Sequence, residues 1–360
     1  MAKQQAERFL QLQSPLGADQ LWLTSFRGQE ELSRLFDYEL AMISENTSIS
    51  ATDIVGKGVT FSVRLPDDSF RHFHGIVNRL YAGDESDGVR NYRAKVVPWL
   101  WFLTRTSDCR IFQQKSVPDI LEQVFQDLGF SDFEISASGH HPTRDYCVQY
   151  RETDFQFVSR LLEEEGMFYF FTHEEGKHKL VIADRATSYY DLPEAEVDYP
   201  GDVGEIARED HITRWEHLYE FRSGKWAQTD YNFETPSDSL MTQTNTVIGL
   251  PPNDRLEFYD YPGRYGQTSD GQPLTDVRME EDEAQHDIVE GSSLCRTFSP
   301  GGKFTVRQHR CSSEAGKKYV ITKISHEAYE TMAYESSRGA PPFGYRNEFR
   351  AIPDQVAFRP

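Results

Sequence analysis

The sequence is poor in basic residues. It has 38 lysines and arginines against 58 aspartates and glutamates, which gives a formal net charge of −20 at pH 7. Nucleic acids and anionic membrane surfaces recruit proteins through lysine and arginine, so this balance argues against both as partners. No stretch approaches the roughly 18 apolar residues of a membrane span, and residues 1–17 lack the apolar core of a signal peptide. We therefore expect no stable membrane insertion, folding in the cytoplasm, and export, if any, without a signal peptide.

Cysteine is also scarce. The four cysteines, Cys109, Cys147, Cys295 and Cys311, show no C-x-x-C spacing. Four cysteines allow three pairings, and nothing in the sequence selects one of them. We expect the four thiols to be reduced and mostly buried.

The motifs of common enzymes and metal sites are missing. There is no H-E-x-x-H, no G-x-S-x-G and no P-loop or G-x-G-x-x-G string. A glycosidase needs two carboxylates in unequal environments, but with 58 acidic residues such pairs arise by chance. We expect a protein that is not an enzyme and assign no catalytic, cofactor-binding or metal-binding residue. Surface or hydrogen-bonded positions are expected for the histidines, which include His140, His141, His173, His178, His211, His217, His309 and His326.

Short alternating segments fill the first part of the chain, residues 1–104. The segments Phe36–Ile43, Val59–Leu65 and Arg71–Asn78 alternate apolar and polar side chains, and turn residues such as those of 66–68 (PDD) separate them. Short strands at this spacing predict a small antiparallel β-barrel.

The most fully specified segment, 147–171, lies in a region of mixed helix and strand patterns, residues 105–190. Thr153 and Gln156 form a capping box at the start of a helix, and Gly166 ends that helix in the left-handed conformation. The run MFYFF at 167–171 then predicts a strand that is buried on both faces or lies between subunits. Three glutamates at 163–165 crowd the negative end of the helix and need nearby cations. The region predicts a small α/β domain.

Residues 191–360 return to strand patterns. The segments Ile212–Phe221 and Ala227–Phe233 predict a hairpin around Gly224, and residues 235–272 predict a long surface connection. A helix capped by Thr275 would then run to about Glu290, with the EEDE run at 280–283 as a solvated face. This part predicts a second β-barrel, interrupted by the connection and the helix at about 235–292.

Several strings resemble the VgrG spike proteins of type VI secretion. They follow the usual order of that family and together cover nearly the whole chain. They are FHGIV at 73–77, VPWLWFLTRTSDCRIFQQKSVPDIL at 97–121, QYRETDFQFVSRLLEEEGMFYFF at 149–171, YDYPGRY at 259–265 and IPDQVAFRP at 352–360. The valine–glycine repeat that names the family is absent from this sequence.

The resemblance implies a β-rich α+β fold like that of a phage tail hub, with two similar small antiparallel β-barrels and an inserted α/β domain. It places the first barrel in residues 1–104, the insertion in 105–190 and the second barrel in 191–360. It also implies a homotrimer whose six near-equivalent barrels adapt a three-fold spike to the hexameric Hcp tube. Baseplate proteins and effectors are further implied partners, and the assembled protein is expected to be secreted by the type VI system.

Two other functions stay open at this stage. One is a hub protein of a phage or phage-like contractile tail, and the less favoured one is a spike-borne cell-wall hydrolase with a deep pocket and two carboxylates of perturbed pKa. A hub interface should be partly apolar, and our candidates for it are Phe168–Phe171 and the segment of Tyr259 and Tyr261. The family's needle would follow Pro360, so we expect the isolated chain to be a monomer or a weak trimer.

Overall fold

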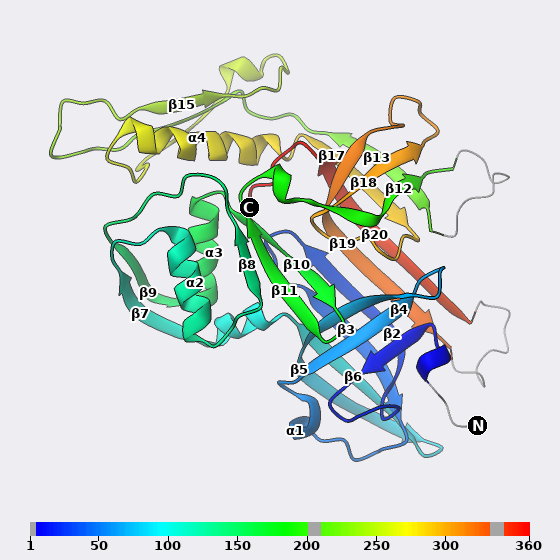
Figure 1. Cartoon of the computed structure of the whole chain (residues 1–360). Coiled ribbons are helices and arrows are strands. Elements are labelled where there is room, and N and C mark those ends of the chain that lie inside the picture. The colour runs from blue at the N-terminus through cyan, green and yellow to red at the C-terminus, as the bar shows by residue number, and fades with distance from the viewer. Residues whose placement is uncertain (1–4, 201–209, 332–341) are drawn as a thin grey trace.

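The fold is dominated by one large curved sheet with smaller layers beside it (Figure 1). We describe a computed structural model, which covers residues 5–200, 210–331 and 342–360. The first described residues, Gln5–Glu7, lie beside the first half of the large sheet, and the C-terminus lies between that sheet and the smaller layers (Figure 1).

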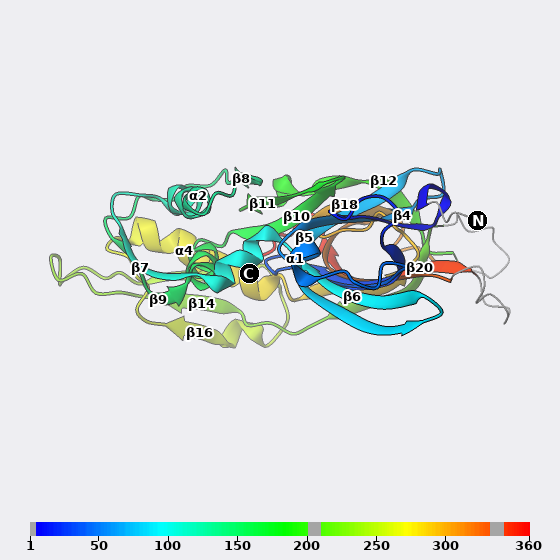
Figure 2. The ribbon, with the colours of Figure 1, turned by 90° about the horizontal axis from the view of Figure 1, so that it is seen from below.

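The first half of the large sheet forms a curved, barrel-like unit. Its strands pair in the order β1-β4-β5-β6-β3-β2, and Figure 2 shows them curving round in a ring. Phe26, Tyr38, Phe61 and Phe73 are buried inside it, and the rings of Phe61 and Phe73 stack at 5.1 Å. The elements are η1 (Gln5–Glu7), β1 (Leu10–Gln13), β2 (Trp22–Glu31), β3 (Asp37–Ser44), α1 (Ala51–Ile54), β4 (Gly58–Arg64), β5 (Phe70–Ser86), β6 (Val89–Val97) and η2 (Trp99–Arg105).

The second half repeats this strand order. Its strands pair as β18-β19-β20-β17-β13, which matches β4-β5-β6-β3-β2 strand for strand in chain order. Phe298, Phe304 and Phe349 form the centre of its own core. The two barrels are therefore similar in topology. The elements are β12 (Tyr190–Asp198), which pairs with β18, then β13 (Ile212–Tyr219), β17 (Asp287–Ser293), β18 (Gly302–Gln308), β19 (Lys318–Glu330) and β20 (Phe343–Pro353).

A shared ladder joins the two barrels. The second part of β19 pairs with β2 in antiparallel fashion, from Lys323 opposite Glu31 to Tyr329 opposite Ser25. The Lys323 ammonium lies 3.2 Å from the Glu31 carboxylate at one end of this ladder. The barrels are thus halves of one sheet rather than separate bodies.

The middle segment packs two helices against short strands. Both helices begin with capping boxes, Ser116 with Asp119 and Thr153 with Gln156, and Gly129 and Gly166 follow the helices with positive φ. The boundaries predicted for residues 147–171 are confirmed. The elements are β7 (Ser107–Phe112), α2 (Val117–Asp127), β8 (Phe133–Ser136), β9 (Cys147–Thr153), α3 (Asp154–Glu164), β10 (Phe168–Glu174), β11 (Lys177–Ala183) and η3 (Ala186–Ser188).

Cations meet two of the three glutamates at the end of α3, Glu164 and Glu165. Arg144 lies 2.7 Å from Glu164 and 2.6 Å from Glu165, and Arg160 lies 3.2 Å from Glu164. These contacts offset the repulsion between the carboxylates and the negative end of the helix. Burial raises the pKa of Glu165, but His141 and Arg144 outweigh it and hold that pKa below its usual value.

We expect Gly166→Ala to lower the free energy of unfolding by about 2–4 kcal/mol. The φ of Gly166 is +65°, which costs an alanine about 1–2 kcal/mol, and its Cβ would lie 2.4 Å from Cγ1 of Val277 on α4. Gly129→Ala is the matched control, since it has the same backbone strain and no atom within 4 Å. Urea unfolding of both variants is the measurement, and equal losses would contradict the contact with Val277.

A small three-stranded sheet packs on the last helix and replaces the predicted hairpin. Strand β14 pairs with β15 and with β16, whereas β13 belongs to the second barrel. The hairpin around Gly224 is therefore wrong. A Cβ on Gly224 would lie 2.1 Å from the backbone oxygen of Asn253, so this glycine permits a close chain crossing. The elements are β14 (Lys225–Gln228), β15 (Thr242–Asn245), η4 (Asn253–Arg255), β16 (Glu257–Asp260) and α4 (Thr268–Glu283).

The last helix differs from its prediction at both ends. It begins at Thr268 rather than at Thr275, so Pro273 lies inside it, and it ends at Glu283 rather than near Glu290. Thr275 is buried, and its hydroxyl donates to the carbonyl of Gly271 at 3.0 Å. The expected cap is therefore an interior residue.

The EEDE run of this helix is not a free solvated face. Glu280 lies 2.7 Å from Arg359, Asp282 lies 3.6 Å from Arg222, and Glu283 accepts a hydrogen bond from the Thr246 hydroxyl at 2.6 Å. The run ties α4 to its neighbours.

The cysteines divide equally between core and surface. All four are free, with Cys147 and Cys295 buried and Cys109 and Cys311 exposed, so the expectation of mostly buried thiols is wrong for two of them. In the part of the chain that the structure describes, no helix has the length and apolar character that a membrane crossing requires.

Candidate functional site: a buried polar cluster and an exposed apolar surface

The most concentrated ionisable chemistry lies at the junction of the two barrels. Glu30 of β2 is buried between two histidines. Nε2 of His326 lies 2.9 Å from one of its carboxylate oxygens and Nε2 of His173 lies 3.3 Å from the other. The hydroxyl of Tyr345 lies 2.7 Å from Nδ1 of His326, and Asn347 donates to that hydroxyl at 3.2 Å. We call these residues the junction cluster.

The charge state of the junction cluster follows from its hydrogen bonds. Burial raises the pKa of Glu30, but hydrogen bonds from His173 and His326 outweigh it and hold the pKa well below its usual value. Burial lowers the pKa of His326. The imidazole of His326 therefore donates from Nε2 to Glu30 and accepts at Nδ1 from Tyr345. Because Glu30, His326 and His173 come from β2, β19 and β10, the cluster fixes both barrels and the middle segment to one another.

A second histidine pair lies next to this cluster. Nδ1 of His74 lies 2.8 Å from Nδ1 of His178, and Nε2 of His178 accepts from the backbone N–H of Trp99 at 2.9 Å. Burial is the main cause that lowers the pKa of His74 to about 4 and that of His178 to about 2. Both imidazoles are neutral at pH 7 and hold β5, β11 and η2 together. Hydrogen-bonded positions were predicted for the histidines, and these pairs have them.

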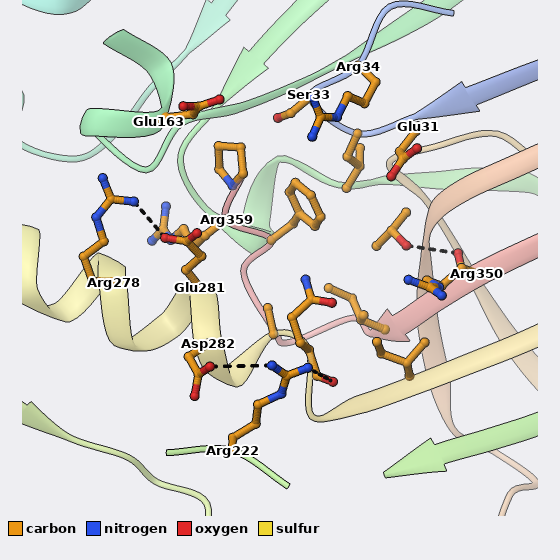
Figure 3. A pocket seen from close by; sticks show the side chains of 18 of the residues that line it. Glu31, Ser33, Arg34, Glu163, Arg222, Arg278, Glu281, Asp282, Arg350 and Arg359 are labelled. Atoms are coloured by element: carbon orange, nitrogen blue, oxygen red, sulfur yellow. Dashed lines mark hydrogen bonds and ion pairs between the residues drawn. The ribbon is translucent and has the colours of Figure 1, made fainter. Parts of the chain in front are cut away.

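A cavity of about 470 Å³ lies between the barrels, α4 and the C-terminal segment (Figure 3). Two ion pairs lie within its wall, since Arg278 lies 2.7 Å from Glu281 and Arg222 lies 3.6 Å from Asp282. The guanidinium of Arg359 donates to the carbonyls of Gly166 and Asp184 at 2.6 and 2.7 Å. Figure 3 shows arginines and carboxylates on several sides of the space. The contact of Arg222 with α4 and those of Arg359 with the middle segment thus join the layers around the cavity.

The described residues give little support to a hydrolase. A general acid requires a carboxyl group with a raised pKa in a cavity. Burial raises the pKa of Glu194, but Glu194 does not line the cavity of Figure 3. Among residues 5–200, 210–331 and 342–360, no group of three or more histidine, cysteine, aspartate or glutamate side chains is placed to hold a metal ion.

Exposed apolar side chains gather in one part of the chain. Of the nineteen large apolar side chains that are exposed in the described residues, eleven fall within residues 218–261, although this range holds about an eighth of the chain. Exposed apolar side chains of this size are candidates for contacts with a partner. We call this group, which is defined by its sequence range, the apolar surface; its members are Leu218, Tyr219, Phe221, Tyr231, Phe233, Met241, Val247, Leu256, Phe258, Tyr259 and Tyr261.

The two interface candidates from the sequence have different outcomes. Phe168–Phe171 is buried within the chain, with exposed fractions of 0–4%. One face of β10 packs on the core of the first barrel, and on the other face Phe168 and Phe170 contact Tyr189 and Tyr190. As an interface candidate this segment is therefore wrong. Tyr259 and Tyr261 are 56% and 57% exposed, so they remain available to a partner.

Tyr261 also lines a broad cleft. The cleft measures about 1000 Å³ and separates the segment after β16 from Tyr146 and the end of α3. Arg264 reaches across it to Glu164 at 2.8 Å. Tyr146 on the opposite wall is 56% exposed, so each wall of the cleft carries an exposed tyrosine.

The comparisons with known proteins agree with this architecture. The family model of the phage tail baseplate hub (GPD) matches residues 29–332. The chain belongs to this family. The match runs from Gln29 near the end of β2 to just beyond β19, so it includes three of the seven residue pairs in the ladder that joins the two barrels.

The relatives also confirm the resemblance to VgrG. The type VI secretion system spike protein VgrG1b of Pseudomonas aeruginosa PAO1 is 38% identical over 361 residues, which cover 100% of this chain and 48% of VgrG1b. The chain spans about half the length of the curated relatives it matches. These relatives are named as spike proteins of type VI secretion, and none of the three names describes an enzyme.

Solved structures confirm the β-rich hub fold. The c3393 protein of E. coli aligns with a TM-score of 0.71 at 20% identity, covering 97% of this chain and 79% of that protein. Its title describes a component of the type VI secretion system with structural similarity to the T4 bacteriophage tail proteins gp27 and gp5. A tail protein from Neisseria meningitidis MC58 aligns with a TM-score of 0.67 at 11% identity, covering 97% of both chains. The predicted phage tail hub-like fold is thus confirmed.

Proposed function

We propose that this chain is the hub of a type VI secretion spike and works as a homotrimer that adapts three-fold symmetry to the hexameric Hcp tube. The observation that carries the proposal is the pair of barrels with the same strand order. Three chains present six such barrels, and six similar surfaces can meet a six-fold tube. The family and the spike relatives support this role.

The hub acts through its surfaces and performs no chemistry. The junction cluster is buried and has its hydrogen bonds made, which suits a rigid joint. We propose that the apolar surface, with Tyr259 and Tyr261, becomes covered in the assembled apparatus by another subunit, a baseplate protein or an effector. Assembly would take place in the cytoplasm, and the type VI system would then secrete the protein. The division at 104/105 and 190/191 remains our proposal for the domains.

The test is electron microscopy of this protein mixed with its cognate tube hexamer, together with sedimentation over a concentration series. We expect end-on rings with three-fold symmetry docked on the tube, and a trimer that grows with protein concentration and with salt, since three chains carry a formal charge of −60 (3 × −20). A protein that stays monomeric and does not bind the tube would refute the proposal.

A hub of a phage-like contractile tail is the second candidate. The tail protein from Neisseria meningitidis MC58 supports it, because that structure matches this chain over nearly its full length. The genes beside this one distinguish the two, since a type VI cluster and a prophage tail cluster differ in their neighbours.

A further inference from the structure

The two barrels share local details as well as strand order. The corresponding strands β2 and β13 each carry a one-residue bulge at a threonine, Thr24 in β2 and Thr213 in β13. Each threonine hydroxyl donates to a backbone carbonyl of the neighbouring strand at 3.1 Å, and those carbonyls belong to Ala41 and Ser292. Ala41 pairs with Ser25, and Ser292 pairs with Arg214, in each case the residue after the bulge. The bulges therefore align β13 with β2 residue by residue.

The long strands β5 and β19 correspond in the same way. Each has a shift in register against its neighbour at the same place, between Val77 and Arg79 in β5 and between Ile321 and Lys323 in β19. Arg79 in the first barrel thus occupies the position of Lys323 in the second. The correspondence runs through Ala82, after which β5 carries a second shift that β19 lacks.

One sheet edge is paired in the second barrel, whereas the corresponding edge of the first barrel is unpaired within the described residues. The edge of β19 beyond β18 pairs with β2, from Lys323 to Tyr329. The corresponding edge of β5 is hydrogen-bonded only through Val77, which pairs with Gly56 and Lys57 just before β4, and no strand of the described residues pairs with it beyond that point. The edge of β2 that receives β19 corresponds to the free edge of β13, which pairs within the described residues only with β17. The chain therefore has two complementary open edges.

We propose that β5 of one copy pairs with β13 of the next copy and so repeats between chains the β19–β2 ladder found within each chain. The proposal rests on the trimeric hub proposed above and names its interface. The two open edges lie at opposite ends of the barrel pair (Figure 1). An interface of this kind joins two different faces, which a closed ring of three copies requires. Each chain then contributes one internal ladder and one external ladder.

The register transferred from the internal ladder brings suitable side chains together. Lys323 opposite Glu31 becomes Arg79 opposite Glu220, so a cation again faces a carboxylate. The next two positions place Leu80 opposite Tyr219 and then Tyr81 opposite Leu218. Both pairs are apolar, and Tyr81, Leu218 and Tyr219 are exposed at 41%, 42% and 59% in the single chain. Charge and apolar character thus match in this register, and two members of the apolar surface acquire a partner.

Disulfide trapping tests the register. Opposite residues in an antiparallel pair bring their Cβ atoms within about 4.5–5.5 Å, close enough for a disulfide after a small adjustment. The exposed Cys109 and Cys311 are first replaced by serine. In that background, Leu80→Cys with Tyr219→Cys should give covalent dimers and trimers on a non-reducing gel under mild oxidation. The matched control, Leu80→Cys with Leu218→Cys, shifts one thiol to the other face of the sheet and should give few.

The outcomes separate this inference from the function on which it rests. Trapping of the in-register pair well above the control supports both. A trimer by sedimentation with no trapping, or with equal trapping in the control, overturns the strand pairing and leaves the hub function standing. A protein that stays monomeric and does not bind the tube overturns both.

Charge exchange gives a second readout without cysteines. Arg79→Glu and Glu220→Arg should each weaken the trimer about twofold to fivefold in dissociation constant, and the double variant should recover most of the loss. Arg151→Glu makes the same change in charge at an exposed position on β9, which pairs with β7, and should not respond to Glu220→Arg. A double variant that is no better than the singles would count against the register.

Discussion

Replacing Glu30 with alanine is expected to lower the free energy of unfolding by about 3–5 kcal/mol. The change leaves the buried imidazole N–H of His326 without an acceptor and that of His173 with only the Tyr38 hydroxyl at 3.4 Å, at about 1–3 kcal/mol each, and it opens a void at the barrel junction. Chemical denaturation followed by circular dichroism measures the loss. Glu30→Gln should fall between the two proteins, because an amide can still accept one of the two hydrogen bonds.

Glu31→Ala is the matched control. Glu31 is the next residue of the same strand, carries the same side chain and lies in the partly exposed ion pair with Lys323. Its loss should cost within about 1 kcal/mol. If Glu30→Ala costs no more than Glu31→Ala, the junction cluster does not stabilise the fold in the way described.

The second large effect is a loss of folding stability in mild acid, at pH values above those at which exposed carboxylates become protonated. An unfolded histidine has a pKa of about 6.5, whereas burial lowers the pKa of His74 to about 4 and that of His178 to about 2. Below pH 6.5 the unfolded chain therefore binds protons that the folded chain does not. Stability is lost as the pH falls, by roughly 2 kcal/mol for each of the two imidazoles by pH 5.

The measurement is the free energy of unfolding at intervals between pH 7 and pH 5. His74→Asn should reduce the slope by about one proton, or about 1.4 kcal/mol per pH unit. His140→Gln is the control, since His140 is exposed, and it should leave the curve unchanged. A slope that stays the same in His74→Asn would show that this imidazole is already charged in the folded protein.

Features set by neighbouring residues were predictable from the sequence. The capping box of Thr153 and Gln156 and the glycine stop at Gly166 lie within 14 residues of one another, so the local sequence determines them. The start of α4 was missed because proline is disfavoured inside a helix, whereas the helix begins five residues before Pro273 and contains it. The missed partner of β14 is β16, which is about 30 residues further along the chain and parallel to it.

The junction cluster could not be predicted because it depends on distant partners. Glu30 lies in a polar string, GQEE, and nothing nearby shows that it is buried. Its partner His326 is 296 residues away and reaches it only when β19 crosses from one barrel to the other. The equivalence of β5 with β19 was hidden for the same reason, since the matching bulges have no common sequence motif. Of the eleven residues of the apolar surface, only Tyr259 and Tyr261 were predicted as interface residues.

The strand β19 has a mechanical consequence. It is 13 residues long and contributes to both barrels, so the barrels cannot swivel without breaking a ladder of cross-strand pairs. A force that pushes one barrel past the other is therefore resisted as shear along that strand and is shared between the two barrels. In the role proposed above, this stiffness would transmit a load through the protein instead of letting the barrels bend relative to one another.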